Sequence, residues 1–117
     1  MFIVTAVLSG LLAAAMAQSA VKKINPDKDS LVLRDRLGVP PRVWTAVGVP
    51  EALAAVGLVA GLWWAPLGVA AAVGVALVMA GAVAFHLRAR LFGAALAPPI
   101  GIGAVAIAAA ILRALTA

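Results

Sequence analysis

One acidic side chain in this sequence lies where a charge is costly. Glu51 is the only ionisable residue between Val43 and Ala65, and apolar residues surround it for more than two helical turns on each side. A segment this long and apolar is expected to cross a membrane, where a charged group must be neutralised, paired or hydrated. Glu51 is therefore a candidate for ligand binding or for general acid–base chemistry.

Other polar side chains are expected near Glu51. On helix rise alone, Glu51 lies about 14 Å inside the membrane edge marked by Arg42. The single histidine, His86, ends another apolar run on the same side. Gln18 and Lys22 share one helix face at i, i+4 near the end of the first run. We expect an apolar cavity with a few convergent polar groups, which is typical of a small-molecule site. Its predicted catalytic residues are Glu51 and His86, and its predicted ligand-binding residues are Gln18, Lys22, Lys23 and Arg88.

Each of these residues also has a structural interpretation. Glu51 could hold helices together through a hydrogen bond to His86 or to a backbone carbonyl. Gln18 could be an interhelical hydrogen-bonding residue, while Lys22 and Lys23 could be ordinary basic anchors at a membrane surface. His86 could lie at the membrane interface and help to orient its helix. The site hypothesis depends on these side chains converging at similar depths.

The composition defines the class of protein. The chain has 117 residues, of which 66% are hydrophobic and 11% charged, against about 25% charged in a typical soluble domain. A soluble fold of this length could not bury so much apolar surface. The absence of cysteine excludes thiol–disulfide chemistry and a Cys/His zinc site, and one histidine cannot supply bis-histidine haem ligation within a subunit. No metal site is expected.

The apolar runs predict an all-α, polytopic membrane protein. A single four-helix bundle over residues 1–117 would have helices at about 2–21, 42–64, 66–88 and 97–115. Pro50 should kink the second helix mildly. A short interfacial helix is expected in the first loop, from Leu31 to Leu37, with Ser30 as its N-cap and Gly38 as its stop.

The basic residues predict an orientation. The net charge is +5, and eight of the nine Lys and Arg residues lie in or beside the loops at 21–42 and 88–96. This bias places both loops in the cytoplasm and both termini outside, in a cytoplasmic (inner) membrane. Since the basic residues flank the spans, no nucleic-acid-binding face is expected. Small residues four apart, such as Gly57 and Gly61, favour close helix packing and make a homo-oligomer plausible.

Several motifs resemble those of the DoxX-like membrane proteins. Leu37-Gly38-Val39-Pro40-Pro41 and Gly48-Val49-Pro50-Glu51, with Gly57 six residues after the glutamate, resemble the family's Leu-Gly-x-Pro turn and Gly-x-x-Glu motif. Ala80-Gly81-Ala82 followed by His86-Leu87-Arg88 resembles its third-helix ending, and Lys23-Ile24 resembles the Lys-Leu that closes its first helix. The likeness covers nearly the whole chain. It implies a four-helix membrane bundle with functional positions at Lys23, Glu51, His86 and Arg88.

The resemblance also implies several roles. Some DoxX-like proteins resemble small subunits of thiosulfate:quinone oxidoreductases or partners of redox complexes, and distant relatives act as receptor-assembly chaperones. The first hypothesis is therefore a redox-accessory subunit with a membrane or cytoplasmic oxidoreductase partner, in which a quinone-type lipid would enter laterally from the bilayer. The second is an enzyme that acts on a lipophilic substrate by isomerisation, cyclisation or epoxide opening, with Glu51 as acid or base. The third is a non-catalytic assembly factor.

Overall fold

The computed structural model describes residues 1–117 and contains only helices. They are α1 (Phe2–Ile24), α2 (Lys28–Leu37), α3 (Pro41–Ala60), α4 (Ala65–Arg88), the short 3-10 helix η1 (Gly93–Leu96) and α5 (Ala97–Leu115). The helices α1, α3 and α4 and the η1–α5 segment are each long and apolar enough to cross a membrane. The predicted all-α fold with four candidate spans is therefore confirmed.

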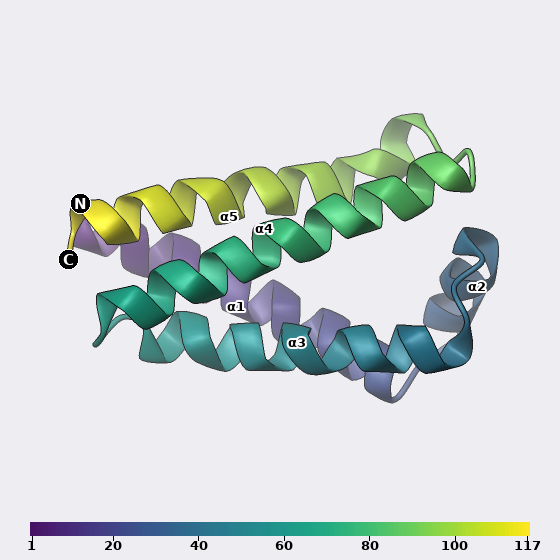
Figure 1. The fold of residues 1–117 in the computed structure, drawn as a ribbon, viewed down its shortest axis with the longest axis horizontal. Coiled ribbons are helices and arrows are strands. Elements are labelled where there is room, and N and C mark those ends of the chain that lie inside the picture. Colours follow the sequence, from purple (N-terminus) through teal and green to yellow (C-terminus); the bar gives the residue numbers. More distant parts are fainter.

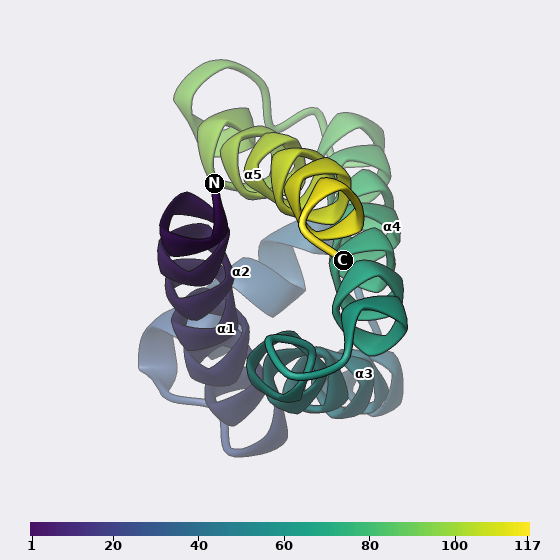
Figure 2. The same ribbon diagram turned by 90° about the vertical axis from the view of Figure 1, so that its left-hand side faces the viewer.

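The four long helices form a ring in the order α1, α3, α4, α5 (Figure 2). Helix α1 packs on α3 and α5, and α4 packs on the same two helices from the other side. Both termini lie at one end of the bundle, whereas α2 and the α4–α5 connection lie at the other (Figure 1). We name these the terminal end and the loop end.

Large apolar side chains cover the outside of this bundle. Leu11, Leu53, Leu77 and Ile107, one from each long helix, are all more than half exposed. A water-soluble monomer rarely exposes so much apolar surface, whereas lipid tails are as apolar as these side chains. The chain is therefore an integral membrane protein.

The helix in the first loop begins at Lys28 rather than at the predicted Leu31. Asp27 is its N-cap, since the Asp27 carboxylate accepts a hydrogen bond of 2.8 Å from the Ser30 amide. Ser30, the predicted cap, instead donates its hydroxyl to the Lys22 carbonyl at 2.8 Å and so ties α2 to the end of α1. The helix stops at Gly38, as predicted, with a left-handed φ of 70°.

Two long helices end at other residues than the apolar pattern predicts. Helix α1 continues to Ile24 because the first residue that cannot continue it is Pro26. Helix α3 ends at Ala60 instead of Trp64, because the chain turns sharply after Gly61. Trp63 and Trp64 therefore lie exposed in the α3–α4 turn.

The terminal end is closed by two glycines and a buried arginine. A Cβ atom on Gly61 would overlap the Cα of Gly68, so α3 and α4 touch backbone to backbone. The Arg113 guanidinium on α5 donates to the Gly61 carbonyl at 2.8 Å and to the Leu62 carbonyl at 3.3 Å. These carbonyls follow the end of α3 and have no partner within that helix, so Arg113 both satisfies them and links α5 to the turn.

We expect Gly61→Ala to lower the free energy of unfolding by about 2 kcal/mol, as overpacking does, because the new methyl group would overlap the backbone of Gly68. Gly74→Ala on α4 is the matched control, since its Cβ would meet open space. Thermal melting of both purified variants in detergent measures the difference. Equal melting temperatures would contradict this close approach of α3 and α4.

Candidate functional site

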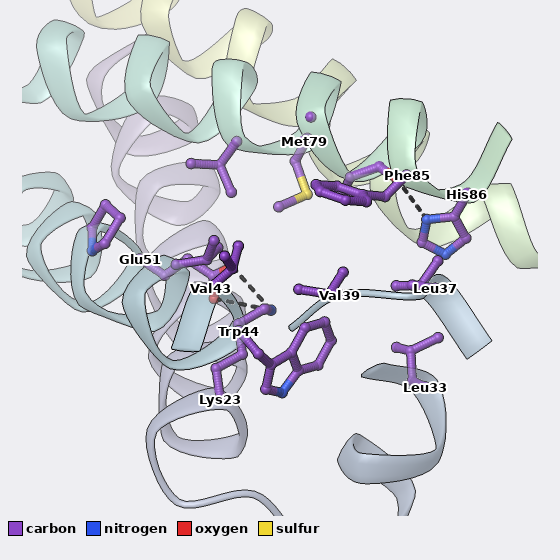
Figure 3. A pocket seen from close by; sticks show the side chains of 15 residues that line it. Lys23, Leu33, Leu37, Val39, Val43, Trp44, Glu51, Met79, Phe85 and His86 are labelled. Atoms are coloured by element: carbon purple, nitrogen blue, oxygen red, sulfur yellow. Dashed lines mark hydrogen bonds and ion pairs between the residues drawn. The ribbon is translucent and has the colours of Figure 1, made fainter. Parts of the chain in front are cut away.

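A cavity of about 230 Å³ lies between α3 and α4 at the loop end, and α2 borders it (Figure 3). Three ionisable side chains reach this cavity: Lys23 from α1, Glu51 from α3 and His86 from α4. The rest of the wall is almost entirely apolar, and it includes Trp44, Met79 and Phe85 together with Leu33, Leu37, Val39, Val43, Val47, Pro50, Val78, Gly81 and Ala82.

Glu51 is 1% exposed and forms an ion pair with Lys23. The Lys23 Nζ lies 3.0 Å from Glu51 Oε1 and donates a longer hydrogen bond of 3.4 Å to Oε2. The nearer contact is not aligned as a hydrogen bond, so Oε1 is buried without a hydrogen-bond partner. A buried carboxylate normally satisfies its oxygens, so this one can still accept a hydrogen bond from a ligand.

The Lys23 ammonium is held from three sides. It donates a hydrogen bond of 2.6 Å to Ser19 Oγ, one turn earlier on α1, in addition to its contact with Glu51. Its Nζ also lies 4.8 Å from the centre of the Trp44 ring, within the range of a cation–π interaction. Because these partners come from two helices, the ammonium is directed across the α1–α3 interface toward the carboxylate.

Gly48 allows α1 and α3 to approach closely enough for this pair. A Cβ atom on Gly48 would lie 2.9 Å from Ile24 Cγ1 and 3.1 Å from Lys23 Cβ. A larger residue would therefore push the end of α1 away from α3. Gly48 precedes Glu51 by three residues, so the same turn of α3 provides both the close approach and the carboxylate.

A second set of hydrogen bonds fixes Trp44. Its indole Nε1 donates to Ser30 Oγ at 3.1 Å, and the same hydroxyl donates to the Lys22 carbonyl. Trp44 is 7% exposed, so the indole N–H needs this partner. The Ser30 hydroxyl therefore joins α1, α2 and α3 beside the cavity.

His86 lies on the α4 wall, separated from Glu51 by the cavity (Figure 3). Its Nδ1 is 2.7 Å from the Ala82 carbonyl. A carbonyl oxygen only accepts hydrogen bonds, so Nδ1 carries the proton of this contact. Nε2 has no hydrogen-bond partner in the protein, and in the neutral ring it is an acceptor.

The other predicted site residues do not line this cavity. Gln18, Lys22 and Arg88 are exposed, and the guanidinium of Arg88 lies 5.5 Å from the Phe85 ring. Ser19, rather than Gln18, shares the helix face of Lys23, because it precedes Lys23 by four residues.

Sequence reasoning missed Ser19 and Trp44. Helical spacing in the sequence could have indicated both residues. Ser19 precedes Lys23 by one turn and Trp44 precedes Glu51 by two turns, so each faces the same way as its partner. No group of three or more His, Cys, Asp or Glu side chains lies together in the fold.

We expect Lys23→Met to destabilise the protein more than Glu51→Gln. Loss of Lys23 leaves the buried carboxylate without a cation, which costs about 3 kcal/mol or more. Loss of the carboxylate leaves an ammonium that is 15% exposed and can turn toward water. SDS-induced unfolding of the purified variants measures both effects.

The double variant of Lys23→Met and Glu51→Gln provides the control for that comparison. It should be more stable than Lys23→Met alone, because the isolated charge is removed together with its partner. If the single Lys23→Met variant is as stable as the native protein, the ion pair does not constrain the fold.

The comparisons with known proteins agree with this architecture. The model of the DoxX-like family matches residues 7–112. No functionally curated protein and no solved structure matches the chain. The family match includes all three ionisable residues of the cavity, the second and third candidate spans, and most of the first and fourth. The chain therefore belongs to the DoxX-like family of membrane proteins.

Proposed function

We propose that this protein binds a lipophilic small molecule with a carbonyl-bearing ring, of the quinone type, in the cavity between α3 and α4. The observation that carries this proposal is the buried Lys23–Glu51 pair, which opens into an otherwise apolar cavity. Apolar walls with a few fixed polar groups are typical of small-molecule sites. A flat ring fits among the side chains of Trp44, Phe85 and Met79.

The polar groups of the cavity match both oxidation states of such a ring. The Lys23 ammonium can donate to a quinone carbonyl, and the unpartnered Glu51 Oε1 can accept from a quinol hydroxyl. The Nε2 atom of His86 offers an acceptor on the opposite wall. Glu51 and His86 would therefore exchange protons with the two ends of the ring when it is reduced or reoxidised.

The redox role proposed here is that of an accessory subunit. Reduction of a quinone to a quinol requires two electrons and two protons, and this chain has no cysteine to carry electrons. The electrons would come from an oxidoreductase partner in the membrane or the cytoplasm, while this protein would hold the ring and supply the protons. The reason for this assignment is the resemblance to the DoxX-like proteins, some of which resemble small subunits of thiosulfate:quinone oxidoreductases.

Trp44 provides a direct test of ring binding. Replacement of the exposed Trp63 and Trp64 by phenylalanine leaves Trp44 as the only tryptophan. A benzoquinone that enters the cavity should quench Trp44 fluorescence saturably in lipid nanodiscs. The corresponding quinol is measured by its displacement of the benzoquinone, and we expect Glu51→Gln to weaken quinol binding at least about tenfold, as loss of a hydrogen bond to a charged group does.

Gln18→Ala is the matched control. Because Gln18 is exposed on α1, its replacement should leave quenching unchanged. Absence of saturable quenching in the native protein would contradict quinone binding. Turnover of a lipophilic substrate by the purified protein alone would favour the acid–base enzyme instead. If Glu51→Gln and His86→Ala lower only the melting temperature, the protein is an assembly factor.

We further propose that the loop end faces the cytoplasm. The basic loops at 21–42 and 88–96 lie together at this end (Figure 1), as the positive-inside rule requires. Because the chain has no native cysteine, one introduced thiol reports one position. A membrane-impermeant maleimide on intact cells should label Ala117→Cys at the terminal end and leave Lys28→Cys unlabelled. The reverse pattern would contradict this orientation.

A further inference from the structure

A second hollow continues the cavity along the outer seam between α3 and α4. It has a volume of about 250 Å³, and its wall is formed by side chains of these two helices alone. The cavity and this hollow share two lining residues, Pro50 of α3 and Val78 of α4. The polar-lined cavity and the apolar groove are therefore neighbours along the α3–α4 seam, with Pro50 and Val78 at their shared edge.

The register of the two helices makes this groove straight. On α3, Pro50, Ala54 and Gly57 follow one another at spacings of four and three residues and so lie on one face. On α4, Val78 and Gly74 repeat this spacing and lead on to Leu67 at the far end. From Val78 to Ala71 the α4 side is about 10 Å long at the rise of an α-helix.

The groove is open to the surrounding lipid beside the cavity. Pro50 and Gly81, which line the cavity, are both exposed on the outside of the bundle. A Cβ atom on Gly81 or on Gly74 would meet no atom within 4 Å, so no side chain covers the seam at these points. Farther from the cavity the helices touch, since a Cβ on Gly57 would lie 2.9 Å from the Ala71 methyl group.

We infer that cavity and groove hold one molecule, a quinone-type lipid whose ring occupies the cavity and whose hydrocarbon tail lies along the α3–α4 seam. The inference rests on the proposed function and specifies its ligand as a tailed lipid. The ligand enters sideways from the bilayer between Pro50 and Gly81. Its tail follows the groove toward the terminal end, as far as the contact of Gly57 with Ala71.

The tail should add affinity by packing rather than by leaving water. A lipid tail in the bilayer is already in an apolar medium, so the groove offers only closer contact than neighbouring lipids do. We therefore expect a moderate effect of about tenfold between a decyl-tailed quinone and the same ring without a tail. The dissociation constants are expressed as mole fractions in the bilayer, so that partition into lipid does not contribute.

The test uses Trp44 quenching in the background without Trp63 and Trp64. Gly74→Leu fills the middle of the groove and should abolish the advantage of the decyl tail while leaving the tail-less ring bound as before. Gly101→Leu on α5 is the matched control, because this position also has open space at its Cβ but lies outside cavity and groove. Melting temperatures of both variants check that the bundle is intact.

The outcomes separate this inference from the proposed function. Saturable quenching by both quinones, with a tail advantage that Gly74→Leu removes and Gly101→Leu keeps, supports it. Equal affinity of the two quinones in the native protein overturns the tail groove but leaves ring binding in place. A tail advantage that persists in Gly74→Leu also overturns it. If neither quinone quenches Trp44, the proposed function itself fails.

Discussion

A carboxylate buried in a membrane-spanning helix needs a cation beside it, and this need constrains the loop end of the bundle. Helix α3 cannot provide the cation, because its only basic residue, Arg42, lies more than two turns away. Lys23 comes from the last turn of α1, and it reaches Glu51 only because Gly48 lets the two helices approach. The positions of Lys23 on α1 and of Gly48 and Glu51 on α3 therefore all follow from one requirement, that the buried carboxylate has a cation beside it.

The two ends of the bundle are held differently, and the cavity follows from that difference. At the terminal end, Gly61 and Gly68 bring α3 and α4 into backbone contact, and Arg113 fastens α5 to the same turn. At the loop end, no glycine pair joins these two helices, and the larger side chains Met79 and Phe85 lie between them. Helices α3 and α4 therefore separate toward the loop end, where α2 and the Ser30 hydrogen bonds border the space.

Much of this architecture is predictable from the sequence because membranes constrain sequences strongly. A long apolar run crosses the bilayer, and an isolated acidic residue within it needs a partner. For that reason the four candidate spans and the unusual position of Glu51 follow from pattern alone. Which side chains converge does not follow in the same way. Spacing along α1 places Ser19 on the face of Lys23, but only the packing of α1 on α3 brings that face to Glu51.

Other details depend on contacts between distant segments. In the sequence, Arg113 is a lone basic residue at the end of the last span. In the structure its guanidinium crosses the bundle and donates a hydrogen bond to the Gly61 carbonyl at the end of α3. The end of α3 is set by Gly61, which is needed for contact with Gly68, and hydropathy does not report such contacts. Ser30 could cap a helix by its type, but Asp27 lies one turn earlier and takes this role.

The Lys23–Glu51 pair lies between polar side chains at the loop end and the hydrocarbon core of the bundle. Lys23 lines the apolar cavity and, on its other side, a smaller polar pocket of about 170 Å³ with Ser19, Asp29 and Ser30. Toward the terminal end the neighbouring core is hydrocarbon, with Leu58 among its fully buried side chains. The next buried polar side chains toward the terminal end, Ser9, Thr5 and Arg113, lie beyond this layer of hydrocarbon. The buried carboxylate thus lies at the inner edge of the polar groups of the loop end, where its partner Lys23 is still 15% exposed.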